Sequence, residues 1–408
     1  MRLLIHDFAG HAFQVQLSRE LAARGHAVTH VYADGLAGPK GRLTRLDCDP
    51  ACFHIHGLRL SSHFKKYSAH RRFVTQRKYA SDLKQLIRRT QADVVLSGNT
   101  PIDIQAELLW HCKRHKVGFI HWLQDLYCEA LRYFLKRRFP LGTPIAGLFK
   151  LLEMVVTSRS DHTVVISPEF ERLLGRWNIP SSKITTIENW APLEEMERTC
   201  QDLENDWRRT QEFSSRPVLL YSGTLGMKHR PDLLYRLAKD LNEECTVVVI
   251  TEGIGRDYLD RMPPLENLRT LQFQPYEKLP EILASADVLL ATLEKDAGQF
   301  AVPSKILTYL CAGRPILFSG PKENLSASII ERSGAGLVVD PEDSFAWVNA
   351  ARKLVRDSNL RLRLGKNARS YAERTFNIST IADEFESVLF SACKPSAEIA
   401  SVATTITA

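Results

Sequence analysis

The residues best suited to chemistry in this sequence lie in a glycine-rich loop, YSGTLGMKHRPDLL at residues 221–234. Gly223 and Gly226 keep the backbone of this loop slim, and Lys228 adds a cation. Pro231 fits the first turn of a helix, and the free backbone N–H groups of a helix start attract anions. Glycines, a lysine and a helix start therefore predict a phosphate-binding loop, although the GxxxxGKS/T spacing of a P-loop is missing.

A second candidate for phosphate binding is the segment VPSKILTYLCAGRPILFSG at residues 302–320. Pro303 and Ser304 start a helical pattern, which Gly313 ends before the next apolar run. The backbone N–H groups of Ser304 and Lys305, together with the lysine ammonium, suit a diphosphate. The sequence thus predicts two cationic corners that grip one diphosphate.

Three side chains in the first half of the chain could act on an acceptor hydroxyl. His121 and Asp125 flank the end of a strand-like run in FIHWLQDLY, and either could orient or deprotonate such a group. His11 is a third candidate and follows Gly10, which allows close backbone approach in the turn HDFAGH at 6–11. That turn offers N–H groups to an anion but lacks the GxGxxG pattern of dinucleotide-binding loops. The alternative is an ordinary turn and three structural polar side chains.

In both halves of the chain, short apolar runs typical of β-strands alternate with helical patterns. The runs of the first half are Arg2–His6, Val28–Tyr32, Asp93–Ser97, Val117–Trp122, Thr163–Ile166 and Ile184–Ile187. Those of the second half are Val218–Ser222, Thr246–Thr251, Leu268–Gln272, Val288–Ala291, Pro315–Phe318 and Gly336–Val339. Near-continuous apolar strands alternating with helices indicate parallel sheets covered on both faces. We therefore expect two tandem Rossmann-like, doubly wound α/β domains, whose ligand loops at the carboxyl ends of the strands face an interdomain cleft.

The boundary between the domains is expected in the polar segment APLEEMERTCQDLENDWRRTQEFSSR, which a new strand follows at once. The predicted organisation is a first domain at 1–195, a linker at 196–216, a second domain at 217–370, a helix at 371–392 that returns to the first domain, and a loose tail at 393–408.

The two lysine-bearing segments, in this order and about 80 residues apart, resemble the nucleotide-sugar-binding domain of family 4 glycosyltransferases. The string PSKILTYLCAGRP is similar to one in the branch that includes fucosamine and colanic-acid transferases. Segments that look like the family's acceptor domain are WLQDLYCEA at 122–130, HTVVISPEF at 162–170 and ITTIENWAP at 184–192. The resemblance covers roughly residues 1–390 and is strongest after residue 217.

The resemblance implies the GT-B fold and transfer of a sugar, usually with retention at the anomeric carbon, from a UDP- or GDP-sugar to a glycan or lipid-linked acceptor. It also implies a place in surface polysaccharide biosynthesis, with neither a cofactor nor an essential metal. Lys228 matches the family's loop lysine, and Ser304 and Lys305 match its phosphate-facing helix start. Tyr276 ends the stretch that usually holds the base. We expect Lys305 or Arg230 to supply the second positive charge.

The chain departs from the family pattern at three positions. Thr224 stands where many members carry an arginine, and Phe300 and Thr308 stand where the family has a pair of glutamates. The Thr308 hydroxyl can still bond a ribose, but a carboxylate role is lost at both positions. Glu294 and Asp296, slightly upstream, are candidates to replace it.

Positive charge is concentrated in the first half of the chain. Residues 1–195 hold 28 Lys and Arg against 18 Asp and Glu, and residues 51–150 hold 18 against 6. Two basic stretches with interleaved aromatics, at 63–89 and 132–150, admit three interpretations: a solvated face, nucleic-acid binding or an anionic membrane surface. We favour peripheral contact with an anionic membrane, because acceptors in the resembling branch are often lipid-linked, and we expect no nucleic-acid partner.

A cytoplasmic location, at the inner face of the membrane, is expected. No apolar run approaches the roughly 20 residues of a membrane span, and no signal peptide is evident. The 8 cysteines are scattered rather than arranged as a disulfide framework.

Two weaker patterns point to other ligands. Cys48, Cys52, His54 and His56 could bind zinc, but their spacing differs from the common finger, and the two histidines alternate as on one face of a strand. The sequence GIG at 253–255 is a fragment of a dinucleotide motif without its third glycine, so a structural turn is the better interpretation.

Two other functions are compatible with the sequence. One is a sugar-nucleotide epimerase of the same two-domain shape, which would turn over the donor without an acceptor. The other is a GT-B scaffold that binds a nucleotide or a partner without transfer, an interpretation favoured by the missing glutamate pair.

Overall fold

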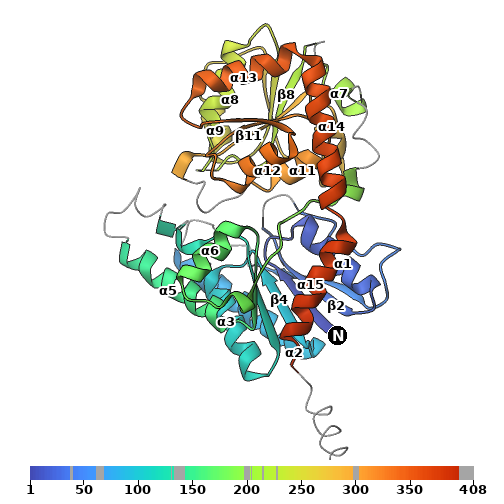
Figure 1. The fold of residues 1–408 in the computed structure, drawn as a ribbon, viewed down its shortest axis with the longest axis vertical. Coiled ribbons are helices and arrows are strands. Elements are labelled where there is room, and N and C mark those ends of the chain that lie inside the picture. Colours follow the sequence, from blue (N-terminus) through green and yellow to red (C-terminus); the bar gives the residue numbers. More distant parts are fainter. Residues whose placement is uncertain are drawn as a thin grey trace, which may run out of the picture. The chain divides into compact units, whose positions relative to one another are not determined.

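The computed structural model describes residues 1–36, 40–60, 69–129, 131–132, 143–196, 203, 205–213, 216–226, 228–296 and 303–394. The chain forms two compact units, one made of Met1–Glu188 with the residues from Ile378 onward, the other of Asn189–Asn377. Each unit has one parallel β-sheet with helices packed against it (Figure 1). The expectation of two doubly wound α/β domains is confirmed.

The sheet of the first unit has seven parallel strands in the order β3-β2-β1-β4-β5-β6-β7. The strands are β1 (Arg2–Asp7), β2 (Ala27–Asp34), β3 (Phe53–Arg59), β4 (Val94–Gly98), β5 (Gly118–Leu123), β6 (His162–Val165) and β7 (Ile184–Thr186). The strand order reverses between β1 and β4, which opens a crevice for ligands at their carboxyl ends. Strand β3 was not among the expected strands, although the alternation around His54 had suggested one there.

Helices cover both faces of this first sheet. They are α1 (Ala12–Ala23), α2 (Ala69–Thr90), α3 (Ile102–Arg114), α5 (Thr143–Arg159), α6 (Pro168–Arg176) and α15 (Ile378–Ala392), with a short 3-10 turn η2 (Ser181–Lys183). Buried side chains of α2, α3 and α5 form one core with residues of the central strands. Helices α1 and α15 pack against each other, and α15 contacts β4, β5 and β6.

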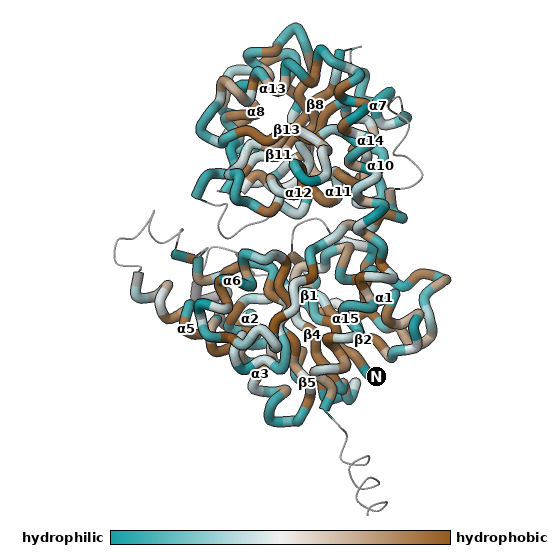
Figure 2. The backbone as a smooth tube through the Cα atoms, viewed as in Figure 1, coloured by the Kyte–Doolittle hydropathy of each residue, from teal (hydrophilic) through white to brown (hydrophobic). Residues whose placement is uncertain are grey.

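The sheet of the second unit has six parallel strands in the order β10-β9-β8-β11-β12-β13. The strands are β8 (Val218–Ser222), β9 (Thr246–Ile250), β10 (Leu268–Leu271), β11 (Val288–Thr292), β12 (Ile316–Ser319) and β13 (Gly336–Val339). Strands β9, β11 and β12 are buried along their whole length. Figure 2 shows these apolar strands enclosed by helices with polar outer surfaces. The switch point of this sheet lies between β8 and β11.

The helical elements of the second unit follow the same alternation. The helices are α7 (Asp206–Thr210), α8 (Pro231–Asp240), α9 (Ile254–Asp260), α10 (Leu279–Ala284), α11 (Lys305–Cys311), α12 (Leu325–Ser333), α13 (Ser344–Arg356) and α14 (Ser358–Thr375). Two short 3-10 turns are η3 (Leu193–Met196) and η4 (Tyr276–Lys278). Helices α8, α9 and α13 share one buried core with the strands. In the described ranges, no helix combines the length and the apolar character needed to cross a membrane.

The second unit begins earlier in the chain than the boundary expected from the sequence. Residues 189–195, assigned from the sequence to the first domain, belong to the second unit, where Tyr276 donates a hydrogen bond of 2.5 Å to Glu195. Within the expected linker, α7 is tied to this unit by an ion pair of 3.1 Å between Arg208 and Asp287. Glu195 and Arg208, two described polar residues of this stretch, therefore have partners in the second unit.

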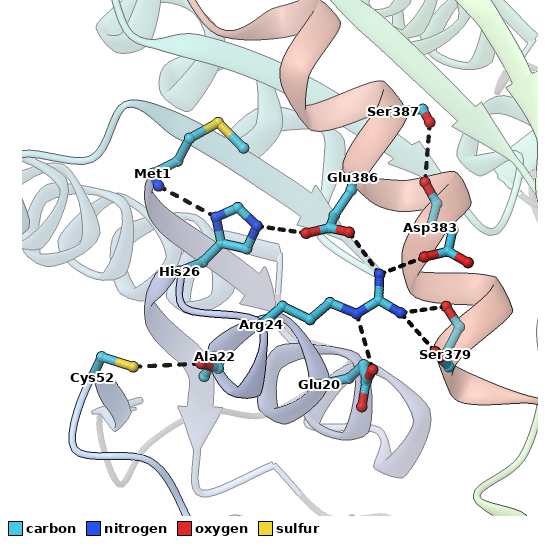
Figure 3. A network of polar contacts seen from close by, with 10 residues as sticks. All are labelled: Met1, Glu20, Ala22, Arg24, His26, Cys52, Ser379, Asp383, Glu386 and Ser387. Atoms are coloured by element: carbon cyan, nitrogen blue, oxygen red, sulfur yellow. Dashed lines mark hydrogen bonds and ion pairs between the residues drawn. The ribbon is translucent and has the colours of Figure 1, made fainter.

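The last helix, α15, is held on the first unit by a polar network around Arg24 (Figure 3). The Arg24 guanidinium lies 2.6 Å from Asp383 and 2.6 Å from Glu386, both on α15. His26 contacts the same Glu386 at 2.7 Å and the N-terminal amine of Met1 at 3.3 Å. The chain thus returns to its starting unit through a helix that begins at 378, after α14 has ended at 375.

Candidate functional site

In the second unit, the loop after β8 lies at the switch point of the sheet and makes room for a lysine. Gly223 has φ +126°, a backbone conformation that favours glycine. A Cβ atom added there would lie 3.0 Å from Nζ of Lys305, which stands at the start of α11. The two lysine-bearing segments predicted from the sequence therefore meet at Gly223.

The amino group of Lys305 is buried and has no hydrogen-bond partner among the described residues. It lies 3.4 Å from the centre of the Tyr221 ring. Burial lowers the pKa of Lys305 well below its usual value, and the nearby charge of Lys228 lowers it further. Because an ammonium carries three donors, a buried one without acceptors is open to an anion.

The loop after β8, which contains Gly223, carries two further basic side chains, Lys228 and His229. Lys228 is half-buried, and its carbonyl accepts a 2.9 Å hydrogen bond from the backbone N–H of Glu294. His229 is buried, and its Nδ1 accepts the N–H of Gly226 at 3.0 Å. Burial, with the charges of both lysines, lowers the pKa of His229 to about 2, so this imidazole is neutral at physiological pH.

Ser304 and Thr308 lie with Lys305 at the start of α11. Ser304 is exposed and its side chain makes no capping hydrogen bond, and Thr308 is half-buried one turn further along. Residues three apart on a helix share a face, so Thr308 lies on the same face of α11 as Lys305. Thr224 is exposed, and its carbonyl accepts the hydroxyl of Tyr221 at 3.0 Å.

Of the two candidates for a second positive charge, Lys305 is the available one. Arg230 is held in an ion pair of 2.6 Å with Asp232 and donates to the carbonyl of Pro341 at 2.8 Å. Lys305 has no such partner among the described residues. The Arg230 guanidinium is thus already engaged by other groups, whereas the Lys305 nitrogen has no hydrogen-bond partner among the described residues.

The remaining candidates that the sequence offered in this unit are Tyr276, Glu294, Asp296 and Phe300. The hydroxyl of Tyr276 is taken by its hydrogen bond to Glu195. Glu294 is half-buried and Asp296 is exposed. Phe300 lies outside the described residues, so the position of the missing first glutamate has no structural account here.

The first unit has a cavity of about 200 Å³ at the carboxyl end of its sheet. Its walls come from the loops after β1, β4 and β5 and from α3 and α5. His11, His121 and Asp125, the three candidates for acting on a hydroxyl, all line it. They meet because neighbouring parallel strands end at the same edge of a sheet.

His11 is held against a buried carboxylate, that of Asp7. The carboxylate accepts the backbone N–H groups of Ala9, at 3.1 Å, and of His11, and lies 3.4 Å from Nδ1 of the imidazole. Burial alone would lower the pKa of His11, but Asp7, and more weakly Asp125, raise it above the usual value. Burial would raise the pKa of Asp7, yet His11 holds it below its usual value. The side-chain nitrogen of Asn99 lies 3.2 Å from the same Nδ1.

His121 and Asp125 differ in exposure. His121 is buried, with Nδ1 3.4 Å from the Thr157 hydroxyl, and burial lowers its pKa to about 4. It is therefore neutral at physiological pH and suited to hydrogen bonding. Asp125 is exposed at the cavity and is available to a ligand.

Three residues that line this cavity were not among the sequence candidates. Glu153 is buried and accepts the backbone N–H groups of Tyr127 and Cys128 at 2.9 and 3.0 Å, which fixes the turn after Asp125. Gln105 has a buried side-chain oxygen without a partner among the described residues, and Asn99 contacts His11. An acidic residue inside an apolar helical stretch could have drawn attention to Glu153, whereas no local pattern marks the two amides.

No metal site emerges from the part of the chain that the structure describes. Its His, Cys, Asp and Glu side chains form no group of three or more that could hold an ion. His54 and His56 lie on β3, and Cys48 is an exposed free thiol. Gly253, in the fragment of a dinucleotide motif, has φ +85° and precedes α9 as a turn residue.

Comparison with known families gives two matches that together span most of the chain. Residues 13–195 match the family model described as Glycosyltransferase Family 4. Residues 204–371 match the model described as Glycosyl transferases group 1.

Among curated proteins, the chain is similar to two bacterial glycosyltransferases. It is 24% identical over 251 residues to the colanic acid biosynthesis glycosyl transferase WcaI of Escherichia coli, a match that covers 60% of this chain and 60% of that protein. It is 26% identical over 278 residues to the glycosyltransferase WbjE of Pseudomonas aeruginosa, covering 65% and 66%. The matches therefore span between three-fifths and two-thirds of these relatives.

Solved structures share the fold over nearly the whole chain. Sucrose-phosphate synthase of Thermosynechococcus elongatus superposes with a TM-score of 0.70 at 16% identity, covering 95% of this chain and 98% of that one. HepE of Anabaena, in complex with UDP-glucose, gives a TM-score of 0.68 at 13% identity, covering 96% and 100%.

Proposed function

This chain belongs to the family 4 glycosyltransferases and has the GT-B fold, and from this premise we propose that it transfers a sugar from a nucleotide diphosphate donor to a glycan or lipid-linked acceptor. The donor is a UDP- or GDP-sugar, the anomeric configuration is retained, and the product enters a surface polysaccharide. Two comparisons support the proposal. WcaI is named for colanic acid biosynthesis, and the structure of HepE contains UDP-glucose. The observation that carries it is the buried amino group of Lys305 beside Gly223, which has no hydrogen-bond partner in the described part of the chain.

The two lysines of the second unit act on the leaving group. Breaking the bond between a sugar and a diphosphate builds negative charge on the departing phosphate. Lys228 and Lys305 stabilise that charge, and cations positioned in advance contribute more to the transition state than to the ground state. Thr308, on the face of α11 that carries Lys305, bonds a hydroxyl of the nucleotide ribose.

The cavity of the first unit receives the acceptor. Asp7 fixes the orientation of the His11 imidazole, as a carboxylate does when it holds one ring nitrogen of a histidine. Asp7 also raises the pKa of His11 against the effect of burial, and a histidine within reach of a hydroxyl can exchange a proton with it. Asp125 and His121 orient the acceptor by hydrogen bonds.

Helices α5 and α3 contact the membrane that holds the acceptor. Leu148 and Leu151 of α5 are 65% and 58% exposed, and Trp110 of α3 is 51% exposed. The Arg159 guanidinium lies 5.3 Å from the Trp110 ring, and Lys150 is also exposed on α5. Apolar side chains flanked by cations suit the surface of an anionic membrane, and this supports peripheral contact.

No metal ion or cofactor takes part in the proposed reaction. The positive charge that a divalent cation would bring to the diphosphate comes from Lys228 and Lys305 instead. Transfer in an excess of EDTA should proceed at the rate measured without it, and a loss of activity that Mg²⁺ or Mn²⁺ restores would contradict this assignment.

Incubation of the purified protein with UDP- and GDP-sugars, with and without an extract of lipid-linked acceptors, tests the proposed function. Release of free nucleotide that requires the acceptor is the expected result. An altered sugar without acceptor would instead identify an epimerase. Nucleotide binding with neither reaction would identify a non-catalytic scaffold.

A further inference from the structure

The surroundings of the Lys305 amino group suit a neutral amine better than an ammonium ion. The nitrogen is buried, and no described residue offers it a hydrogen-bond acceptor. It lies against the face of the Tyr221 ring, 3.4 Å from the ring centre, and beside the Cα of Gly223. An aromatic face attracts a cation, but it does not replace the three acceptors that an ammonium requires.

The charges around this nitrogen also disfavour a proton. The neighbouring charge that acts on Lys305 is that of a second lysine, Lys228, and no described carboxylate forms an ion pair with either lysine. A buried cation without a counter-ion loses its proton rather than remain charged. A diphosphate would reverse both conditions, because its oxygens supply acceptors and negative charge at once.

We propose that Lys305 is an uncharged amine in the free protein and takes up one proton from solvent when a nucleotide diphosphate binds. The inference rests on the proposed function, because it requires the diphosphate as the counter-ion. The step is balanced: the amine lone pair accepts a proton from water or buffer, and the resulting ammonium pairs with a phosphate oxygen. The second positive charge of the site therefore exists only in the complex, and the free protein never has to bury it.

The other titratable groups that face Lys305 do not account for such a proton. His229 uses Nδ1 to accept the N–H of Gly226, a bond that protonation of this nitrogen would break. Tyr221 and Tyr309 are buried phenols whose pKa values burial raises, so both stay neutral. The hydroxyl of Tyr309 accepts the N–H of Ser222 at 3.1 Å and remains engaged.

Calorimetric titration of the full-length protein with UDP and with GDP tests the proposal. At pH 8.5 the phosphates of either probe are deprotonated, since the second pKa of a phosphate monoester is about 6. Heats measured in buffers of different ionisation enthalpy give the number of protons bound, and about one per nucleotide is expected. Affinity should fall by up to about tenfold per pH unit over the range in which the complex holds this proton and the free protein does not, because the free protein then binds one proton fewer than the complex.

Matched variants assign the proton to one residue. Lys305→Arg carries a permanent charge, so it should bind UDP without proton uptake. Lys305→Met should also abolish the uptake and weaken binding, and it covers the case in which arginine does not fit over the Tyr221 ring. Lys228→Arg and His229→Gln should retain the uptake, and thermal unfolding of each variant verifies that it is folded.

The outcomes separate this proposal from the proposed function. Binding of UDP or GDP to the wild type without proton uptake would overturn the role of Lys305 and leave the donor site intact. Uptake that persists in Lys305→Arg and Lys305→Met would equally overturn it. A protein that binds neither nucleotide nor inorganic pyrophosphate would overturn the inference and the proposed function together.

Discussion

At the scale of single residues, the side chains of Lys228 and Lys305 differ in how closely other residues enclose them. Lys305 is enclosed between Tyr221 and Gly223, so its replacement disturbs packing as well as charge. Lys228 is half-buried in the loop after β8, and among the described residues its backbone carbonyl, rather than its side chain, makes a hydrogen bond. Lys228 is therefore the cleaner position at which to remove a positive charge.

Lys228→Ala should lower sugar transfer by about 100- to 1,000-fold, the cost of losing one group that stabilises transition-state charge. The thermal unfolding temperature should stay close to that of the wild type, since the side chain forms no ion pair or hydrogen bond with the described residues. Donor turnover under saturating acceptor measures the effect, and Lys239→Ala, an exposed lysine in the last turn of α8, is the control. Equal turnover by Lys228→Ala and wild type would show that the phosphate cradle lies elsewhere.

The Asp7–His11 pair gives a pH dependence whose sign follows from its two shifts. The pKa of His11 is raised in the folded protein. His11 therefore contributes its full stabilisation of the fold below the pKa of an unfolded histidine, and this stabilisation is lost as the pH rises through the pKa of His11 in the folded protein. The lowered pKa of Asp7 means that its contribution is present above the unfolded aspartate value and is lost as the pH falls through the folded one. The pair therefore stabilises the first unit between these two folded pKa values.

Asp7→Asn should lower the pKa of His11, because the carboxylate that raises it is gone while the burial that lowers it remains. NMR titration of the imidazole resonances measures the change. Asp125→Asn should lower the same pKa by less, since Asp125 is the weaker of the two acidic neighbours. A His11 pKa that is unchanged in Asp7→Asn would mean that the two side chains are not in contact.

At the scale of elements, the docking of α15 on the first unit depends on close approach to β5. A Cβ at Gly118, the first residue of β5, would lie 2.3 Å from the carbonyl oxygen of Ala392 at the end of α15. The aromatic rings of Trp122 on β5 and Phe385 on α15 pack with centres 4.7 Å apart. The helix thus continues the apolar layer over the sheet, and the Arg24 network fixes its position.

Gly118→Ala should destabilise the first unit by about 1–3 kcal/mol, because the added methyl group meets backbone atoms that cannot rotate away. Urea unfolding followed by circular dichroism measures the loss. The matched control is Gly175→Ala on α6, where a Cβ would have no neighbour within 4 Å. That control should be neutral or stabilising by up to about 1 kcal/mol, since alanine favours helix. Equal stabilities of the two variants would contradict the close contact with α15.

At the scale of the whole molecule, charge and exposed apolar surface coincide in the first half of the chain. Residues 1–195 carry the excess of Lys and Arg, and the exposed leucines of α5 belong to the same unit. The second half contains exposed apolar side chains as well, such as Phe345 at 70%, but no excess of positive charge. A membrane that attracts the protein electrostatically should therefore contact the first unit.

In a flotation assay with vesicles of phosphatidylglycerol and phosphatidylcholine at low salt, the wild type should float with the vesicles. Binding should decline as salt is added, because added ions screen the attraction. The double variant Leu148→Ser and Leu151→Ser should lose most of the binding, whereas Phe345→Ser on α13 should keep it. Flotation of the double variant at wild-type levels would show that α5 is not the membrane face.

Much of the fold was readable from the sequence because it depends on local patterns. Apolar runs bounded by polar segments placed the strands to within a few residues, and their alternation with helices fixed the parallel topology. Strand β3 was not among the expected strands because Phe53 is its only buried residue, so it lacks the apolar run that marks the other strands. The second unit begins at Asn189, ahead of the segment expected as a linker, and a polar segment resembles a linker until its partners, such as Asp287 for Arg208, are known.

The candidate site was likewise predicted in part from local sequence patterns and decided in part by the tertiary structure. The sequence by itself determined the glycine-and-lysine segments and the three candidates His11, His121 and Asp125, since each lies near or after the carboxyl end of a strand and such positions share one edge of a parallel sheet. Only the tertiary structure decided that the Lys305 nitrogen is buried over Tyr221, that Asp7 holds His11, and that Glu153 fixes the turn after Asp125. These contacts join residues that no sequence period relates, and burial, which sets their charge states, is a property of the packed chain alone.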